Sequence, residues 1–225
     1  MIVVVLNLSS GSRMYTSNAH LVLGDHNALD DVNTLVDVGR DPLIIEKIYE
    51  APTGVGKHRV EQVVLTHSHY DHAEALPLIR EAFHPVVYAF SPSLEGVDHI
   101  LKGGETLKLG DRMFEVIYTP GHSHDSICLY CEQEQTLFAG DTTLIVQSLD
   151  GTYEEGYIHA LEKLCRRDIS TIYFGHGEPL LKDCNRTLRN TLRNVKESCR
   201  LVESSRGRVV NGRTGTTDQW ANGSS

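Results

Sequence analysis

Short apolar runs alternate with segments of helical spacing along this 225-residue chain. Near its start, three apolar runs are separated by the polar loops SSGSRMYTSN and GDHNALDD, which predicts three strands joined as a β-meander. Further along, the two-residue period of strands gives way repeatedly to the spacing of amphipathic helices. Strands are predicted at 3–8, 20–23, 34–38, 63–65, 85–90, 113–120, 126–131, 136–141 and 170–177, and helices at 42–50, 73–83, 157–166 and 183–202.

Strands and helices are mixed in both halves of the chain, which is typical of the α/β fold class. The length favours one domain, which we place at residues 1–204. Residues 205–225 are rich in Gly, Ser, Thr and Asn, and a segment of that composition could hardly bury a core of its own. We therefore predict a C-terminal tail over these residues.

Composition and charge limit the classes of partner. Hydrophobic residues make up 40% and charged residues 23%, with a formal net charge of -9. The chain thus reads as an ordinary soluble globule without a long-range charge attraction for nucleic acid or anionic membranes. No run of about 18 apolar residues is present, and the opening MIVVVLNLSSGS lacks the basic start of a secretory signal. We expect a cytoplasmic protein that acts on a small molecule, and a homo-oligomer is left open.

Cysteine usage agrees with that location. The five cysteines show no framework spacing, which predicts free thiols in a reducing compartment. Cys128 and Cys131 form a CxxC, but both fall in one predicted strand. An offset of three residues in a strand turns two side chains to opposite faces, so a redox pair is not expected.

The stretch THSHYDHAEALP places three histidines and an aspartate within six residues. Imidazole and carboxylate groups hold Zn²⁺ or Fe²⁺ near neutral pH, and this stretch lies between a buried strand and a helix, where a loop can turn alternate side chains inward. We expect His67 and His69 to face one ion, and Asp71 and His72 to face another.

Three more candidate ligands follow predicted strands. His122 lies in TPGHSHDS, Asp141 follows TLFAG, and His176 lies in FGHGEP. A glycine beside each allows the backbone to turn so that the side chain points into a cleft. Together with the HxHxDH stretch they make seven ligands, enough for two ions.

These motifs, taken in order, resemble the five-part signature of the metallo-β-lactamase superfamily. The resemblance implies an αβ/βα four-layer sandwich of two mixed sheets flanked by helices, with a metal site at one edge of the sheets. It also implies that Asp37, in LVDVG, braces the site from behind the ligands. Carried over by position, the first metal is held by His67, His69 and His122, the second by Asp71, His72 and His176, and Asp141 bridges both.

The chemistry implied by the resemblance is hydrolysis. A hydroxide shared by two divalent transition-metal ions attacks an ester-like bond, while one metal polarises the substrate carbonyl. Asp71 is expected to orient the hydroxide and then to pass its proton to the leaving group. Zinc is the expected metal because no cysteine is among the ligands, with iron and manganese as alternatives.

Departures within the superfamily narrow the substrate. Asp141 occupies a position where true β-lactamases of this fold generally lack an aspartate, and no flavodoxin domain or long RNA clamp is seen. The chain looks like the glyoxalase II and lactonase branch, which implies a small acyl thioester or lactone. Tyr153 falls near a tyrosine that touches the substrate thiol in glyoxalase II, but Gly151 replaces the partner lysine and the helical glutathione-binding domain is not seen.

Several assignments stay open. Leu144 stands where homoserine-lactone hydrolases have a tyrosine, which weakens that identification, and Tyr15 and Met14 are candidate pocket residues. A basic helix face is either solvated or attracts an anionic acyl carrier or a second subunit. Rival functions are a mononuclear iron oxidoreductase resembling persulfide dioxygenase, a phosphodiesterase of the same fold, and a regulatory protein. The basic face consists of Arg186, Arg189, Arg193, Lys196 and Arg200.

Overall fold

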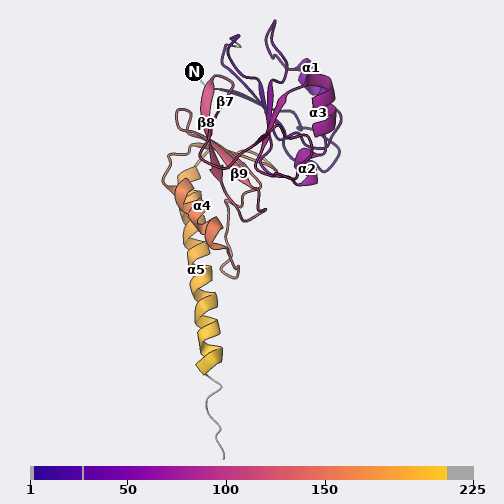
Figure 1. The fold of residues 1–225 in the computed structure, drawn as a ribbon. Coiled ribbons are helices and arrows are strands. Elements are labelled where there is room, and N and C mark those ends of the chain that lie inside the picture. The colour runs from indigo at the N-terminus through magenta and orange to yellow at the C-terminus, as the bar shows by residue number, and fades with distance from the viewer. Residues whose placement is uncertain (1–2, 27, 212–225) are drawn as a thin grey trace, which may run out of the picture.

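Two β-sheets form the centre of the molecule in this computed structural model, which describes residues 3–26 and 28–211 (Figure 1). The first sheet has six strands in the order β1-β2-β3-β4-β5-β6, and the second has five in the order β11-β10-β9-β8-β7. The strands are β1 (Val4–Asn7), β2 (His20–Leu23), β3 (Thr34–Val36), β4 (Gln62–Val64), β5 (Val86–Ala89), β6 (His99–Ile100), β7 (Thr106–Leu109), β8 (Arg112–Tyr118), β9 (Ile127–Cys131), β10 (Thr136–Gly140) and β11 (Thr171–Phe174).

Helices cover the outer face of each sheet, so the molecule has four layers. In Figure 1, α1, α2 and α3 lie beside the first sheet, and α4 and α5 run together beside the second, with α5 projecting well past the sheets. This arrangement confirms the predicted four-layer α/β sandwich. The helices are α1 (Ile44–Glu50), α2 (Tyr70–Ala73), α3 (Leu76–Phe83), α4 (Glu155–Cys165) and α5 (Cys184–Asn211).

Alternation along the strands builds three apolar layers. In β4, Val63 packs with the α1 and α3 side chains, whereas its neighbour Val64 faces the space between the sheets. In β10, Phe138 faces that inner space and Leu137 packs against α4 and α5. Because successive side chains point to opposite faces, each run of apolar residues serves two layers at once.

Strand directions bring the sequence motifs to one edge. The first three strands pair antiparallel, which confirms the predicted meander, and β3, β4, β5 and β6 pair parallel. In the second sheet, β10 and β11 are parallel. The loops that follow β3, β4, β10 and β11 therefore leave from carboxyl ends of strands, where α/β proteins place ligands.

Some local predictions need correction. The helix predicted at 73–83 begins at Leu76 as α3, because Pro77 lies in its first turn and its missing N–H and bulky ring favour a helix start at that point. The short helix α2 over Tyr70–Ala73 precedes it and was not predicted. Strands β6 and β7 lie outside the predicted set, since β6 has two residues and the polar TLKL of β7 lies at the edge of its sheet.

The C-terminal boundary stays a prediction. Helix α5 continues to Asn211, past the expected start of the tail at residue 205, while residues 212–225 lie outside the described part. No helix among the described residues is long and apolar enough to cross a membrane. Cys128 and Cys131 pack in different layers, as their spacing predicts, and all five cysteines are unpaired.

Candidate metal centre

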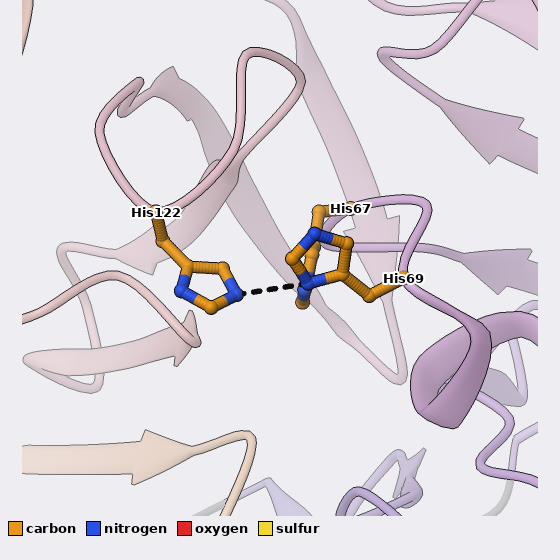
Figure 2. A group of neighbouring side chains, drawn as sticks. All are labelled: His67, His69 and His122. Atoms are coloured by element: carbon orange, nitrogen blue, oxygen red, sulfur yellow. Dashed lines mark hydrogen bonds between the residues drawn. The ribbon is translucent and has the colours of Figure 1, made fainter.

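Three histidines from two distant loops form the first group of ligand atoms. His67 and His69 follow β4, and His122 comes from the loop between β8 and β9. Their ring nitrogens lie within 4.8 Å of one another, and His122 Nε2 is 3.0 Å from His69 Nδ1. Figure 2 shows the three rings converging on one point. The structure thus brings together the three residues predicted to hold the first metal.

A second group combines Asp71, His72 and His176. The first two lie on α2, and His176 follows β11. The ligand atoms of this group also lie within 4.8 Å of one another, with His176 Nε2 at 3.1 Å from Asp71 Oδ2. Asp71 and His72 are buried, so their polar atoms point into the protein and not into solvent. This is the set predicted for the second metal.

Asp141 lies between the two groups. Its Oδ2 is 3.5 Å from His122 Nε2 of the first group and 3.5 Å from His176 Nε2 of the second, and its Oδ1 is 3.3 Å from His72 Nε2. A carboxylate with Oδ2 near both groups and Oδ1 near the second can contact an ion in each. The placement suits the predicted bridging role, and all seven residues meet at one edge of the sheets.

Asp37 supports the cluster through hydrogen bonds to Thr66 and a contact with His72. It accepts hydrogen bonds from the Thr66 backbone N–H at 2.7 Å and from the Thr66 hydroxyl at 2.8 Å, and its Oδ2 lies 2.8 Å from His72 Nδ1. Its backbone is left-handed, with φ at 56°, a conformation that non-glycine residues rarely adopt. Such strain gathers at functional sites. The contact orients His72 so that Nε2 faces the cluster, as a carboxylate behind a ligating histidine does.

Burial and neighbouring charges shift the pKa values of the cluster residues in opposite directions. Burial, helped by the neighbouring His72, lowers the pKa of His67 to about 4. Burial acts against the charged form of His72 too, but Asp37 and Asp141 outweigh it and raise the pKa of His72 to about 10. Burial would raise the pKa of Asp141, yet His72 and His176 hold it at about 2. A cation is therefore favoured between these carboxylates.

Three histidine nitrogens of the cluster have no hydrogen-bond partner in the described part of the chain, which indicates whether these residues suit metal ions. The Nε2 atoms of His67, His72 and His176 are buried and make no hydrogen bond within the described part of the chain. Leaving such an atom unsatisfied costs about 1–3 kcal/mol. One metal ion in each ligand group would satisfy all three, and nitrogen and carboxylate donors without thiolate suit Zn²⁺, Fe²⁺ or Mn²⁺. The residues present fit two such ions.

Two glycines allow the loops to approach this closely. A Cβ on Gly140 would lie 2.4 Å from the Thr66 hydroxyl oxygen, and one on Gly175 would lie 2.1 Å from Asp141 Oδ1. The Gly175 N–H also donates to the Gly140 carbonyl at 2.7 Å, so the two loops are fastened together. The glycines beside Asp141 and His176 are thus required by close contact as well as by turning.

Tyr15, predicted as a pocket residue, lies at the cluster. Its ring stacks on the His176 ring with centroids 5.3 Å apart, and 64% of the residue is exposed. The negative charge of Asp71 is the main cause of a raised pKa at the Tyr15 hydroxyl. Met14 is exposed beside it. Tyr15 therefore borders both the second ligand group and solvent, but it lines none of the three cavities that touch His122, and its contact with substrate stays a prediction.

Tyr153, the other predicted substrate contact, lies beside the cluster. Its ring stacks on Tyr157 and lines a cavity of about 320 Å³ that also touches His122. Its hydroxyl, however, folds back over Gly151, because a Cβ there would lie 2.5 Å from that oxygen. The ring faces the cavity beside the cluster, and the hydroxyl points toward Gly151. Its contact with substrate stays a prediction.

Two further cavities adjoin His122. One, of about 410 Å³, is lined by His122, Asp141 and His176 together with the apolar side chains of Leu144 and Phe174. The other, of about 680 Å³, contains several serines and extends from His69 and His122. Leu144, which replaces a tyrosine of the lactone hydrolases, is buried and belongs to an apolar wall. Three cavities thus touch His122.

The basic face of α5 lies elsewhere. Arg186 and Arg189 line a separate cavity near the start of the helix, which shares no residue with the three around His122. Arg186 pairs with Asp183 at 2.7 Å, and Lys196 pairs with Glu162 at 2.5 Å. These contacts favour a solvated, locally paired face over a wall for an anionic carrier.

Sequence reasoning missed two residues that hold the cluster. Thr66 links Asp37 to His67, with its hydroxyl 3.2 Å from His67 Nδ1. Asn18 donates from its side chain to the Phe174 and Gly177 carbonyls at 3.0 and 2.9 Å. The threonine beside the HxHxDH motif could have been singled out, but no spacing signal links Asn18 to partners more than 150 positions away.

Known proteins share both sequence and fold with this chain. A probable hydroxyacylglutathione hydrolase of Schizosaccharomyces pombe is 35% identical over 124 residues, which are 52% of this chain and 48% of the relative. An atrochrysone carboxyl ACP thioesterase of Aspergillus fumigatus is 27% identical over 154 residues, covering 64% and 46%. The chain thus spans about half the length of these curated relatives.

Solved structures support the same fold. A metallo-beta-lactamase family protein from Thermus thermophilus superposes with a TM-score of 0.62 at 17% identity, covering 86% of this chain and 79% of that protein. At that identity the match speaks for the fold alone. The sequence profile described as Metallo-beta-lactamase superfamily matches residues 15–176, which include every residue of the cluster. The chain belongs to the metallo-β-lactamase superfamily.

Proposed function

We propose that this protein is a dinuclear metal-dependent hydrolase that cleaves a small acyl thioester or lactone. The observation that carries the proposal is the meeting of seven nitrogen and oxygen donors in two groups, with Asp141 within 3.5 Å of both. The names of the relatives agree with it, because one is a hydroxyacylglutathione hydrolase and another an acyl carrier thioesterase. Zinc is the proposed metal, since imidazole and carboxylate donors suit Zn²⁺, and iron and manganese are the alternatives.

Bound ions would supply an activated water and polarise the substrate carbonyl. Asp71 is proposed to accept the proton of that water and to return it to the leaving thiol or alcohol, because its carboxylate is buried and lies at 3.1 Å from His176 Nε2. Asp37 keeps the second nitrogen of His72 occupied, so that Nε2 is free to face the ion. Asp141 is proposed to hold both ions at a fixed separation.

The walls of the cavities favour an uncharged substrate. Among the residues that line the three cavities around His122, none is Lys or Arg, while Glu154 lines two of them and Glu178 lines the third. Neither glutamate has a basic partner in the described part of the chain. Away from the two proposed ions, phosphodiesters and carriers with several negative charges would meet carboxylates on the cavity walls and no fixed basic side chain.

A substrate panel tests the proposal. We expect the zinc-loaded protein to hydrolyse a neutral acyl thioester of N-acetylcysteamine and a simple lactone. With the same acyl group on glutathione, kcat/KM should be about tenfold lower, because two unpaired carboxylates oppose a charged leaving group at moderate salt. Initial rates for matched acyl groups, with bis(4-nitrophenyl) phosphate as the phosphodiester, give the comparison.

The charge effect has its own control. Glu154→Gln should narrow the gap between the neutral and the glutathione thioester, whereas Glu81→Gln on the outer helix α3 should leave it unchanged. Phosphodiester turnover above that of every ester, thioester and lactone would contradict the proposed substrate class. We further propose a cytoplasmic location, which the five unpaired cysteines support.

A further inference from the structure

We propose that residues 15–18, called the strap, set the affinity of the second metal ion by fastening the loop of His176 to that of Asp71. The inference rests on the proposed dinuclear function. Within the strap, Asn18 is the main positioning residue. It touches neither substrate nor metal and acts through the loop that carries His176.

One end of the strap is tied to the α2 side of the cluster. The backbone N–H of Ser17 donates to the Asp71 carbonyl at 3.0 Å. The hydroxyl of Thr16 accepts a hydrogen bond from the Arg40 backbone N–H at 2.9 Å, which fixes the strap to the loop after β3. Ser17 is fully buried, so this attachment is shielded from water. The strap therefore has a fixed position relative to Asp71.

The other end clasps the loop after β11. Asn18 donates from its backbone N–H to the Gly175 carbonyl at 2.6 Å, and its side-chain amide donates to the carbonyls of Phe174 and Gly177 at 3.0 and 2.9 Å. The side-chain oxygen in turn accepts a hydrogen bond from Asn7 at 2.9 Å, which holds the amide in this orientation. Three hydrogen bonds thus surround His176 on both sides.

The clasped loop needs such support. His176 has a glycine on each side, and Gly177 adopts a left-handed backbone with φ at 80°. Glycine backbones lose more conformational entropy on ordering than those of any other residue. Without the Asn18 hydrogen bonds, the loop would have to become ordered when the ion binds, so that His176 Nε2 comes to 3.1 Å from Asp71 Oδ2. That ordering would reduce the free energy of binding of the ion. When the loop is already ordered in the metal-free protein, the ion binds more tightly because no such cost arises.

Tyr15, the first residue of the strap, contacts the His176 side chain directly. Its ring lies nearly parallel to that of His176, at 16°, which limits rotation of the imidazole. The strap's hydrogen bonds and ring stack reach Asn7, Asp71, the loop after β3 and the loop of His176. None of these contacts involves His67, His69 or His122. The strap should therefore affect the second ion and leave the first unchanged.

A zinc titration separates the two ions. Metal-free full-length protein is titrated with zinc against a competing chelator, which gives one dissociation constant for each ion. For Asn18→Ala we expect the second ion to bind about 10- to 100-fold more weakly, the usual effect of removing a group that orients a ligand. The first dissociation constant should stay within about twofold. Asn18→Ser, which keeps one short donor, should fall between these values.

Asn33 offers a matched control. Its side-chain amide also donates to two backbone carbonyls, those of Thr53 and His58, at 2.9 and 2.8 Å. It lies just before β3, at the end of that strand opposite Asp37. Asn33→Ala should lower the melting temperature through the loss of comparable hydrogen bonds, with both zinc dissociation constants unchanged.

The outcomes distinguish the strap from the proposed function. If the unaltered protein and both Asn18 variants bind two ions with equal affinities, the strap has no such role while the dinuclear function stands. Equal weakening in Asn18→Ala and Asn33→Ala would mean a general loss of stability, and would also overturn the inference. A single ion in the unaltered protein contradicts both the inference and the function.

Discussion

Asp71→Asn should lower kcat by more than about a hundredfold at saturating zinc, which is the usual scale for losing a general acid or base. The amide keeps the shape of the side chain, and its oxygen can still reach the ion, but it cannot accept and return a proton. Because Asp71 belongs to the second ligand group, the first ion should stay bound. Steady-state rates and the zinc content of the same sample measure both effects.

A surface aspartate provides the comparison for this variant. Asp98 pairs with Arg80 at 2.8 Å and lies outside the three cavities around His122. Asp98→Asn should leave kcat within about twofold, since ion pairs of this exposure contribute little. Near-normal turnover in Asp71→Asn would remove Asp71 from the proton-transfer role. Loss of the first ion would mean that the whole cluster had been disturbed.

The second large effect is expected from Gly175→Ala. The new methyl group would lie 2.1 Å from Asp141 Oδ1 and 2.6 Å from the His72 Cε1 atom. The loop cannot move aside easily, because its N–H and carbonyl are bonded to Gly140 and Asn18 at 2.7 and 2.6 Å. Asp141 must then shift, and a displacement of about 1 Å at a reacting site costs about a hundredfold in rate. Turnover assays and zinc titration should show both losses.

Gly177→Ala separates steric displacement from backbone strain. A Cβ on Gly177 meets nothing within 4 Å, but its φ of 80° makes alanine unfavourable by about 1–2 kcal/mol. We expect this variant to lose some thermal stability while it retains activity within a few-fold. Equal activities of Gly175→Ala and Gly177→Ala would show that a methyl group at position 175 does not displace Asp141.

The seven candidate ligands could be singled out from the sequence because the signals that mark them are local. Each candidate ligand follows a strand and has a turn-forming glycine or the HxHxDH spacing beside it, so the motif carries both the chemistry and its placement. The four layers were also predictable, although α3 starts three residues later than predicted and the short helix α2 before it was not expected. The structure brings the seven residues together, and their action as ligands stays a prediction.

What the sequence could not supply depends on distant contacts. Asn18 reaches carbonyls at Phe174 and Gly177, and only the folded chain brings these segments together. The direction of the Tyr153 hydroxyl depends on the space above Gly151, which the similarity to glyoxalase II did not reveal. Likewise, the sequence could not show whether the basic residues of α5 face the metal cluster. The structure places Arg186 and Arg189 at a separate cavity.

The central claim is that two ions act together at this cluster, and metal content measured alongside activity tests it most directly. The protein is loaded with zinc, freed of excess metal and analysed for zinc per chain, while thioester hydrolysis is followed as each equivalent is added. We predict two zinc ions per chain and a rate that rises mainly with the second. One ion at full activity, or a preference for a single iron with oxygen uptake, would contradict the account.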